Sequence, residues 1–232
     1  MISANLARIR DKISLICRRL GREPSEIVLV GVAKYAELSQ IKEAIGVGLT
    51  DIGENKVQDA REKFVQLEDT LPGITKHMLG HLQTNKVKHA IELFDLIQSV
   101  DSLELVEEIE KQADKKRKLV DILLEIKTSG EEQKTGALPE DTFSLIEAIA
   151  KCEHIRLCGL MTIAAHTQNQ EIIRNCFRQL KKLFEEAKRK FANVPNIEMK
   201  YLSMGMSDDY EIAIEEGSNM VRIGRAIFEN QR

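Results

Sequence analysis

The chain has 232 residues, of which 43% are hydrophobic and 31% charged, so it can bury a sizeable core and is not a disordered chain. Lysine and arginine total 34 against 37 acidic residues, and the net charge of −3 gives no global electrostatic reason to bind nucleic acid or an anionic membrane. We expect one domain over residues 1–232, a length that suits a single α/β barrel of roughly 200 to 250 residues.

The cysteines indicate the compartment. They show no CxxC spacing and lie among apolar or helical segments, which indicates reduced thiols rather than a disulfide framework or zinc ligands: Cys17, Cys152, Cys158 and Cys176. Neither the N-terminal segment nor any later apolar run reaches the ~18 residues of a membrane span. We therefore expect a cytoplasmic protein without a membrane partner.

The first elements are a helix and a strand. Residues 3–20 carry apolar side chains at spacings of three and four, which predicts an amphipathic N-terminal helix. The run IVLVGVA at 27–33 is short, β-branched and apolar, as is typical of a parallel strand covered on both faces. Further elements follow in alternation: helices at 39–45, 55–67 and from 84, and strands at 50–53 and 76–79.

The alternation continues to the C-terminal part of the sequence. It predicts strands at 93–100, 119–126, 155–160, 199–202 and 219–223, and helices at 103–116, 139–150, 169–191 and 208–216. Eight strands alternating with helices favour an α/β fold, a single closed (β/α)₈ TIM barrel with an extra N-terminal helix. An open doubly wound sheet is the alternative. In a barrel, site residues gather where strands end and βα loops begin.

Lys34 occupies such a position, directly after the first predicted strand. At the mouth of a barrel its amine would be partly desolvated and able to form a Schiff base with an aldehyde. The alternative is a lysine whose stem covers apolar surface while its amine stays in water.

A second cluster lies near the C-terminus, after the seventh and eighth predicted strands, where barrels commonly bind phosphate. Ser207 precedes a helix and Gly224 follows the last strand, so a hydroxyl and closely approaching backbone amides could hold a phosphate. Ser207 could instead be only a helix cap. Asp208 and Asp209 would repel a dianion, and we expect them to point away. Arg222, within the last strand, needs a polar ligand or a buried salt bridge.

Other charged residues are given simpler interpretations. The basic runs at 115–118 and 188–190 lie near helix ends, where positive charge complements the helix dipole, and they are all that would support a nucleic-acid or protein-interaction module. We expect Lys134 to be solvated, the alternative being a second lysine that meets a ligand on its way in or out. No metal site is predicted, because none of the histidines has HExxH-like spacing: His77, His81, His89, His154 and His166.

Several motifs, taken in order, carry a family resemblance over nearly the whole chain. They are GVAK ending at Lys34, DIGENKVQD at 51–59, HMLGHLQTNK at 77–86, SGEEQKTG at 129–136, GLMTIAAH at 159–166 and SMGMSDDYEIAIEEGSNMVRIGRAIF at 203–228. On these motifs the chain resembles the YggS/PROSC family of pyridoxal 5′-phosphate (PLP)-binding proteins, also called pyridoxal phosphate homeostasis proteins. It departs from the usual family pattern at Tyr35, Lys56, Thr128 and Glu229.

The resemblance implies a barrel similar to the N-terminal domain of alanine racemase, with a site for PLP. The cofactor would form a Schiff base with Lys34, its phosphate would meet Ser207 and the backbone of Gly224 and Arg225, and its pyridine nitrogen would face Arg222. It further implies an intracellular role in PLP (vitamin B6) homeostasis and indirectly in amino-acid metabolism, with B6-salvage or PLP-requiring enzymes as exchange partners.

We expect no substantial catalysis. A protonated Arg222 would leave the pyridine nitrogen largely unprotonated, so the ring would be a poor electron sink. The sequence stops soon after the eighth strand, without a separate β-domain like that of alanine racemase, so we also expect a monomer. The alternative is a slow PLP-dependent amino-acid racemase or a related enzyme acting at the α-carbon.

Overall fold

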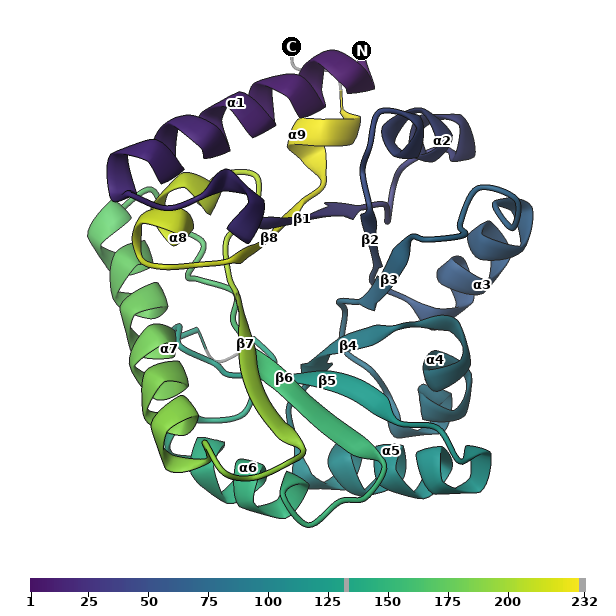
Figure 1. Cartoon of the computed structure of the whole chain (residues 1–232), viewed down its shortest axis with the longest axis vertical. Helices are drawn as coiled ribbons and strands as arrows, with labels where there is room; N and C mark the ends of the chain where they lie inside the picture. Colours follow the sequence, from purple (N-terminus) through teal and green to yellow (C-terminus); the bar gives the residue numbers. More distant parts are fainter. Residues whose placement is uncertain (132–133, 230–232) are drawn as a thin grey trace.

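The computed structural model describes residues 1–131 and 134–229, in which eight parallel strands pair in chain order and close through β8 and β1 (Figure 1). The closed barrel is therefore confirmed and the open sheet is wrong. The strands are β1 (Val28–Val32), β2 (Asp51–Glu54), β3 (Thr75–Met78), β4 (Leu96–Val100), β5 (Val120–Glu125), β6 (Ile155–Met161), β7 (Ile197–Ser203) and β8 (Met220–Ile223).

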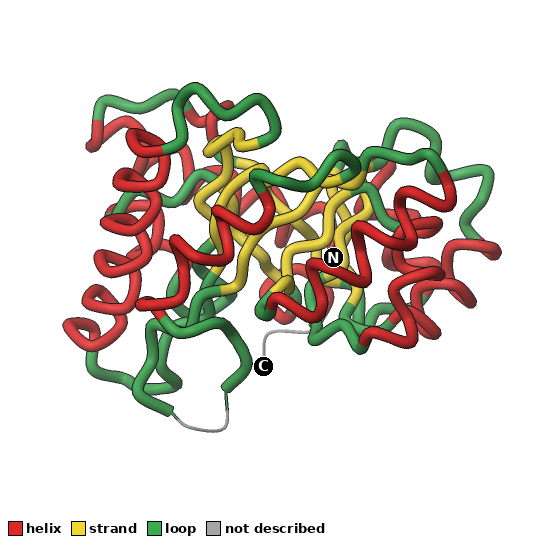
Figure 2. Tube along the Cα trace, turned by 90° about the horizontal axis from the view of Figure 1, so that it is seen from below, coloured by secondary structure: helices red, strands yellow, loops and turns green. Residues whose placement is uncertain are grey.

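Helices surround the strands on the outside (Figure 2). They are α1 (Ile2–Leu20), α2 (Leu38–Gly46), α3 (Val57–Gln66), α4 (Val87–Leu93), α5 (Leu103–Lys116), α6 (Thr142–Ile149), α7 (Gln170–Lys190), α8 (Tyr210–Glu215) and α9 (Arg225–Phe228), with short 3₁₀ turns before β1, α4 and α6. The predicted extra N-terminal helix is α1. Within the described ranges, no helix has both the length and the apolar character needed to cross a bilayer.

Several elements differ from the prediction in their bounds, and one was not predicted. The apolar run at 93–100 is not all strand: Leu93 ends α4, whose C-terminal turn closes with a 3.0 Å hydrogen bond from the Phe94 N–H to the Ala90 carbonyl. β7 is longer than expected at both ends, and α9 was not predicted, because four residues are too few to show a helical period.

The core has an inner and an outer part. The barrel interior is filled by an apolar cluster of Val30, Leu79, Leu96, Leu123, Cys158, Met161 and Met220. Two larger clusters join the outer faces of the strands to the helices. Helix α1 buries one face, including Leu6 and Ile9, and contacts α2, α8 and α9 near the seam between β8 and β1 (Figure 1).

The basic runs at 115–118 and 188–190 lie at the C-terminal ends of α5 and α7, as predicted. Lys115 and Lys116 are in the last turn of α5, and residues 188–190 form the last turn of α7. Lys116 pairs with Glu92, and Lys190 pairs with Glu147 at 2.8 Å. These contacts support the interpretation of both runs as helix-end charges.

Candidate functional site

A cavity of roughly 690 Å³ opens at the carboxyl ends of the strands, between the loops that follow β1, β5, β6, β7 and β8. Its wall includes all five residues expected to bind a cofactor: Lys34, Ser207, Arg222, Gly224 and Arg225. Lys34 and Arg225 are 191 positions apart in the sequence, and the closure of the barrel brings their segments together. The volume is within the range of pockets that enclose small organic ligands, about 300 to 1,000 Å³.

Lys34 lies two residues beyond the end of β1 and lines the cavity. Its side chain is exposed, and Nζ lies 4.8 Å from the centre of the Tyr35 ring. The Tyr35 ring is itself 79% exposed, so Lys34 lies at the open side of the cavity, and the expected partial desolvation of its amine stays a prediction. Tyr35 is one of the positions at which the chain departs from the family pattern, and its contact with Lys34 was not predicted.

The backbone that carries Lys34 is held by an ion pair between the buried Glu54 and the partly buried Lys63, which the sequence did not predict. Lys63 Nζ donates to the Ala33 carbonyl at 2.5 Å and to Glu54 Oε1 at 2.7 Å. Glu54 ends β2 and is fully buried, and its burial raises the pKa of the carboxyl group while the bond from Lys63 opposes that rise. An acidic residue at the end of a strand was the available signal, but its partner on α3 could not be predicted from the sequence.

The expected phosphate-binding segments meet at the rim of the cavity. The Ser207 hydroxyl accepts a hydrogen bond from the Ala226 backbone N–H at 3.3 Å, which joins the loop after β7 to the first turn of α9. The N-cap of α8 is Asp209, so Ser207 does not cap the helix that follows it, and its bond to Ala226 instead satisfies a backbone N–H in the first turn of α9. At Gly224 an added Cβ would lie 3.2 Å from the Val32 carbonyl oxygen, so this crossing favours glycine.

Arg222 is 4% exposed and reaches the cavity from β8. Its Nη1 donates to Ser203 Oγ at 2.6 Å and its Nη2 donates to the Thr162 carbonyl at 2.8 Å. Both acceptors are neutral, so the buried salt bridge considered as an alternative is not what the described residues show. Burial lowers the pKa of Arg222 to about 10, which still leaves the guanidinium protonated at neutral pH.

Lys134 also belongs to this cavity. Its Nζ donates to the Ala164 carbonyl at 2.6 Å and pairs with Glu131 at 2.5 Å. The expectation of a solvated surface lysine is therefore wrong: Lys134, from the loop after β5, contacts the loop after β6 at the cavity wall. Residues 132 and 133, within the SGEEQKTG motif, lie outside the described residues.

These groups form a set with complementary chemistry. A primary amine can condense with an aldehyde, a hydroxyl beside closely packed backbone can hold a phosphate, and a buried guanidinium can donate to a ring nitrogen. Fold and site together define a class, a (β/α)₈ barrel with a cavity at its mouth that is lined by a lysine, a serine and a buried arginine. In agreement with this class, the family model for the alanine racemase N-terminal domain matches residues 4–231.

The particular family follows from closer relatives. A pyridoxal phosphate homeostasis protein of Aquifex aeolicus is 38% identical over 227 residues, which cover 98% of this chain and 97% of that protein. PipY of Synechococcus elongatus, solved with PLP bound, matches with a TM-score of 0.84 and 30% identity over 98% of this chain and 100% of its own. The chain belongs to the pyridoxal phosphate homeostasis protein family.

A more distant match concerns the fold alone. An alanine racemase of Clostridium difficile superposes with a TM-score of 0.73 at 18% identity, covering 99% of this chain but 56% of the racemase. The barrel is thus shared with the racemases.

Proposed function

We propose that residues 1–232 form one domain that binds PLP in the cavity and acts in intracellular PLP homeostasis, and so indirectly in amino-acid metabolism. The protein would shield the reactive aldehyde and exchange the cofactor with enzymes that salvage vitamin B6 or require PLP. The observation that carries the proposal is the convergence of Lys34, Ser207, Arg222, Gly224 and Arg225 on one cavity. The PLP bound to PipY supports the identity of the ligand.

In this proposal Lys34 holds the cofactor through a reversible Schiff base. The amine nitrogen forms a C=N bond with the aldehyde carbon, and the aldehyde oxygen leaves as water. The anchor from Lys63 to the Ala33 carbonyl fixes the backbone next to this lysine, and the exposed position of Lys34 lets an incoming aldehyde reach the amine.

Ser207 and the backbone of Gly224 and Arg225 hold the phosphate in this proposal. The hydrogen bond from the Ala226 N–H fixes the position of the Ser207 hydroxyl oxygen, whose own proton can then be donated to the phosphate. The close crossing of Gly224 over Val32 brings the start of α9 to the cavity. These contacts act without a contribution from Lys34, so phosphate binding and covalent attachment can be tested separately.

Arg222 faces the pyridine nitrogen in this proposal. Because a guanidinium only donates hydrogen bonds, the ring nitrogen accepts and stays largely unprotonated, which makes the ring a poor electron sink. We therefore propose storage and exchange rather than substantial catalysis. Exchange of an amino acid's α-proton in deuterated water, faster than with free PLP, would instead support the slow racemase.

Titration with PLP tests the proposal. The wild-type protein is expected to develop a near-visible absorbance band from the Schiff base, and Lys34→Ala is expected to lose it. Lys182→Ala, which removes an exposed lysine on α7, is the matched control and is expected to behave as the wild type. An unchanged band in Lys34→Ala would show that another amine carries the cofactor.

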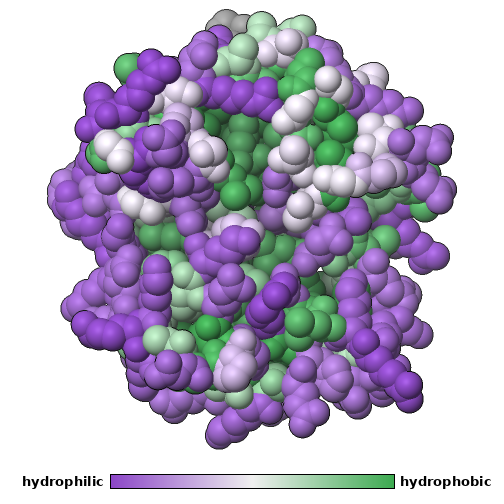
Figure 3. Space-filling view, in the orientation of Figure 1, coloured by the Kyte–Doolittle hydropathy of each residue, from purple (hydrophilic) through white to green (hydrophobic). Residues whose placement is uncertain are grey.

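We also propose that the protein is a cytoplasmic monomer. The cysteines are free thiols, and burial raises the pKa of Cys152 to about 11 and that of Cys158 to about 12, so both stay protonated at neutral pH. On the face shown in Figure 3, hydrophilic side chains border the apolar areas near the centre.

A further inference from the structure

A row of polar side chains crosses the otherwise apolar interior of the barrel. Arg222 Nη1 lies 2.6 Å from Ser203 Oγ, which lies 2.7 Å from Gln98 Oε1. Gln98 Nε2 lies 2.9 Å from His77 Nδ1, and His77 Nε2 lies 3.0 Å from Asp51 Oδ1. The row runs from the cavity, where β8 supplies Arg222, to Asp51 at the start of β2.

The three central residues of the row, Ser203, Gln98 and His77, are buried. His77 is 1% exposed, and Gln98 and Ser203 are fully buried. A buried polar group without a hydrogen bond is costly, so each of these side chains needs its partners. The link between Gln98 and Ser203 joins β4 to β7 across the barrel, between strands that are not neighbours in the sheet.

Donor and acceptor chemistry gives the row one direction. Arg222 only donates, so Ser203 Oγ accepts from it. The single hydroxyl proton of Ser203 is then donated in a hydrogen bond to Gln98 Oε1. The Gln98 amide then donates to His77 Nδ1, which leaves the proton of His77 on Nε2, where it is donated to the Asp51 carboxylate.

The reverse orientation of the Gln98 amide leaves groups unsatisfied. With Nε2 turned toward Ser203, the hydroxyl would face two donors, Arg222 and Gln98, and its own proton would lose its acceptor. In the observed orientation Gln98 Nε2 also donates to Met220 Sδ at 3.2 Å. All bonds therefore point from the buried cation to the carboxylate, an arrangement in which they polarise one another.

We propose that Gln98 is a positioning residue for Arg222: it fixes the Ser203 hydroxyl as an acceptor and so holds the guanidinium in one orientation at the cavity. This inference rests on the proposed function, in which Arg222 faces the ring of PLP. Gln98 acts through Ser203, since Arg222 belongs to the described cavity wall whereas Ser203 and Gln98 do not.

The first test needs no cofactor. Nitrogen-15 shifts of the His77 ring in the cofactor-free wild-type protein are expected to show the proton on Nε2 and a bare, hydrogen-bonded Nδ1. In Gln98→Met the Nδ1 signal is expected to move, because its donor is gone. A proton on Nδ1 in the wild type would mean that the Gln98 amide has the opposite orientation. That result would overturn the proposal, whether or not the protein binds PLP.

The second test follows the effect to the cavity. Gln98→Met is expected to weaken PLP binding by up to about tenfold, the effect of losing one hydrogen bond, because the hydroxyl that holds Arg222 loses its own acceptor. It is also expected to shift the absorbance maximum of the bound cofactor. Gln98→Glu keeps an acceptor for Ser203 and is expected to restore most of the affinity. Leu123→Met, a volume-conserving change in the same interior cluster, is the control and is expected to change neither quantity.

A double-mutant cycle separates positioning from general damage. In an Arg222→Met background, Gln98→Met is expected to change PLP affinity by less than about twofold, because the residue it positions is absent. An equal loss in both backgrounds would overturn the proposal. If the wild type bound no PLP, the proposed function would fail, while the His77 measurement would still decide the direction of the row.

Discussion

Asp208 and Asp209 show how the cavity tolerates acidic residues beside a proposed phosphate site. Both contribute to the cavity wall, and each carboxylate has a partner, so their expected orientation away from a bound phosphate stays a prediction. Asp209 Oδ1 accepts from the Met206 N–H at 2.6 Å, and Asp208 pairs with Arg225. Burial raises the pKa of Asp209, although that bond and the charge of Arg222 oppose the rise.

Ser207→Ala tests the phosphate site at the scale of one residue. Loss of one hydrogen bond to a charged acceptor, about 1.5 to 3 kcal/mol, is expected to weaken PLP binding roughly ten- to a hundredfold. The absorbance of the bound form should stay the same, because Lys34 is intact. Equilibrium titration measures both quantities, with Ser144→Ala on α6 as the control. Unchanged affinity would remove Ser207 from the site.

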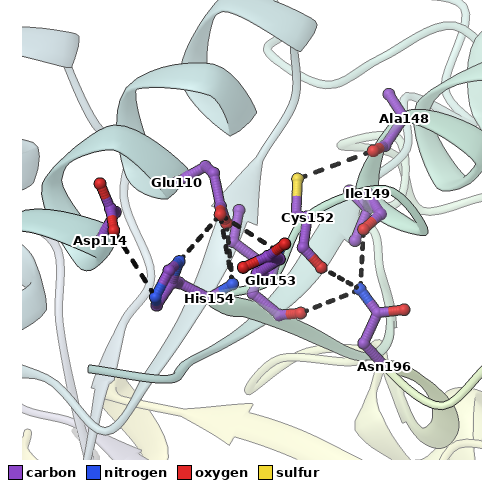
Figure 4. A network of polar contacts seen from close by, with 9 residues as sticks. Glu110, Asp114, Ala148, Ile149, Cys152, Glu153, His154 and Asn196 are labelled. Carbon is purple, nitrogen blue, oxygen red and sulfur yellow. Dashed lines mark hydrogen bonds and ion pairs between the residues drawn. The ribbon is translucent and has the colours of Figure 1, made fainter. Parts of the chain in front are cut away.

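At the scale of elements, side-chain hydrogen bonds fix the loops that lead into β6 and β7, at the end of the barrel opposite the cavity (Figure 4). Glu110 on α5 accepts from the backbone N–H groups of Glu153 and His154 at 3.1 and 3.0 Å, and its Oε1 lies 3.0 Å from His154 Nδ1. Before β7, Asn196 Nδ2 donates to three backbone carbonyls, those of Ile149, Cys152 and Ile155. These bonds hold the starts of β6 and β7 in place.

The pH dependence of stability tests the contact between Glu110 and His154. The hydrogen bond to Glu110 raises the pKa of His154, so its stabilising effect is complete below the unfolded value of about 6.5 and is lost as pH rises through the folded value. Glu110→Gln should therefore lower the urea midpoint more at pH 6 than at pH 9. Glu108→Gln, on the same helix but paired with Lys111, is the control. An equal loss at both pH values would contradict this role.

Local patterns explain which elements could be predicted. Short apolar runs and helical spacing predicted β1, α5 and α7 to within a residue or two at most ends. Contacts between distant strands have no such local pattern. The bond of Lys63 to the Ala33 carbonyl and the link from Gln98 to Ser203 depend on barrel closure and strand register, so periodicity cannot predict them.

For the whole molecule, the N-terminal helix and the last described helix meet over the seam of the barrel (Figure 1). Asn5 on α1 donates from Nδ2 to the Ile227 carbonyl of α9 at 2.9 Å in a buried position. The same apolar cluster joins α1 to residues of β8 and α9, including Val221 and Phe228. The apolar face of α1 is thus used within the chain and is not available for a partner.

That arrangement predicts a monomer. Light scattering at micromolar concentration should give a mass near the 26.3 kDa of the chain, with and without PLP. A mass near twice that value, independent of salt concentration, would show that another surface forms a dimer.

The most direct test of the central claim is to fix the cofactor where it binds. The wild-type protein loaded with PLP is reduced with borohydride, which converts the Schiff base into a stable amine, and is then digested and mapped by mass spectrometry. The proposal predicts that the label lies mainly on Lys34. Label on Lys134 or on surface lysines, with Lys34 unmodified, would contradict it.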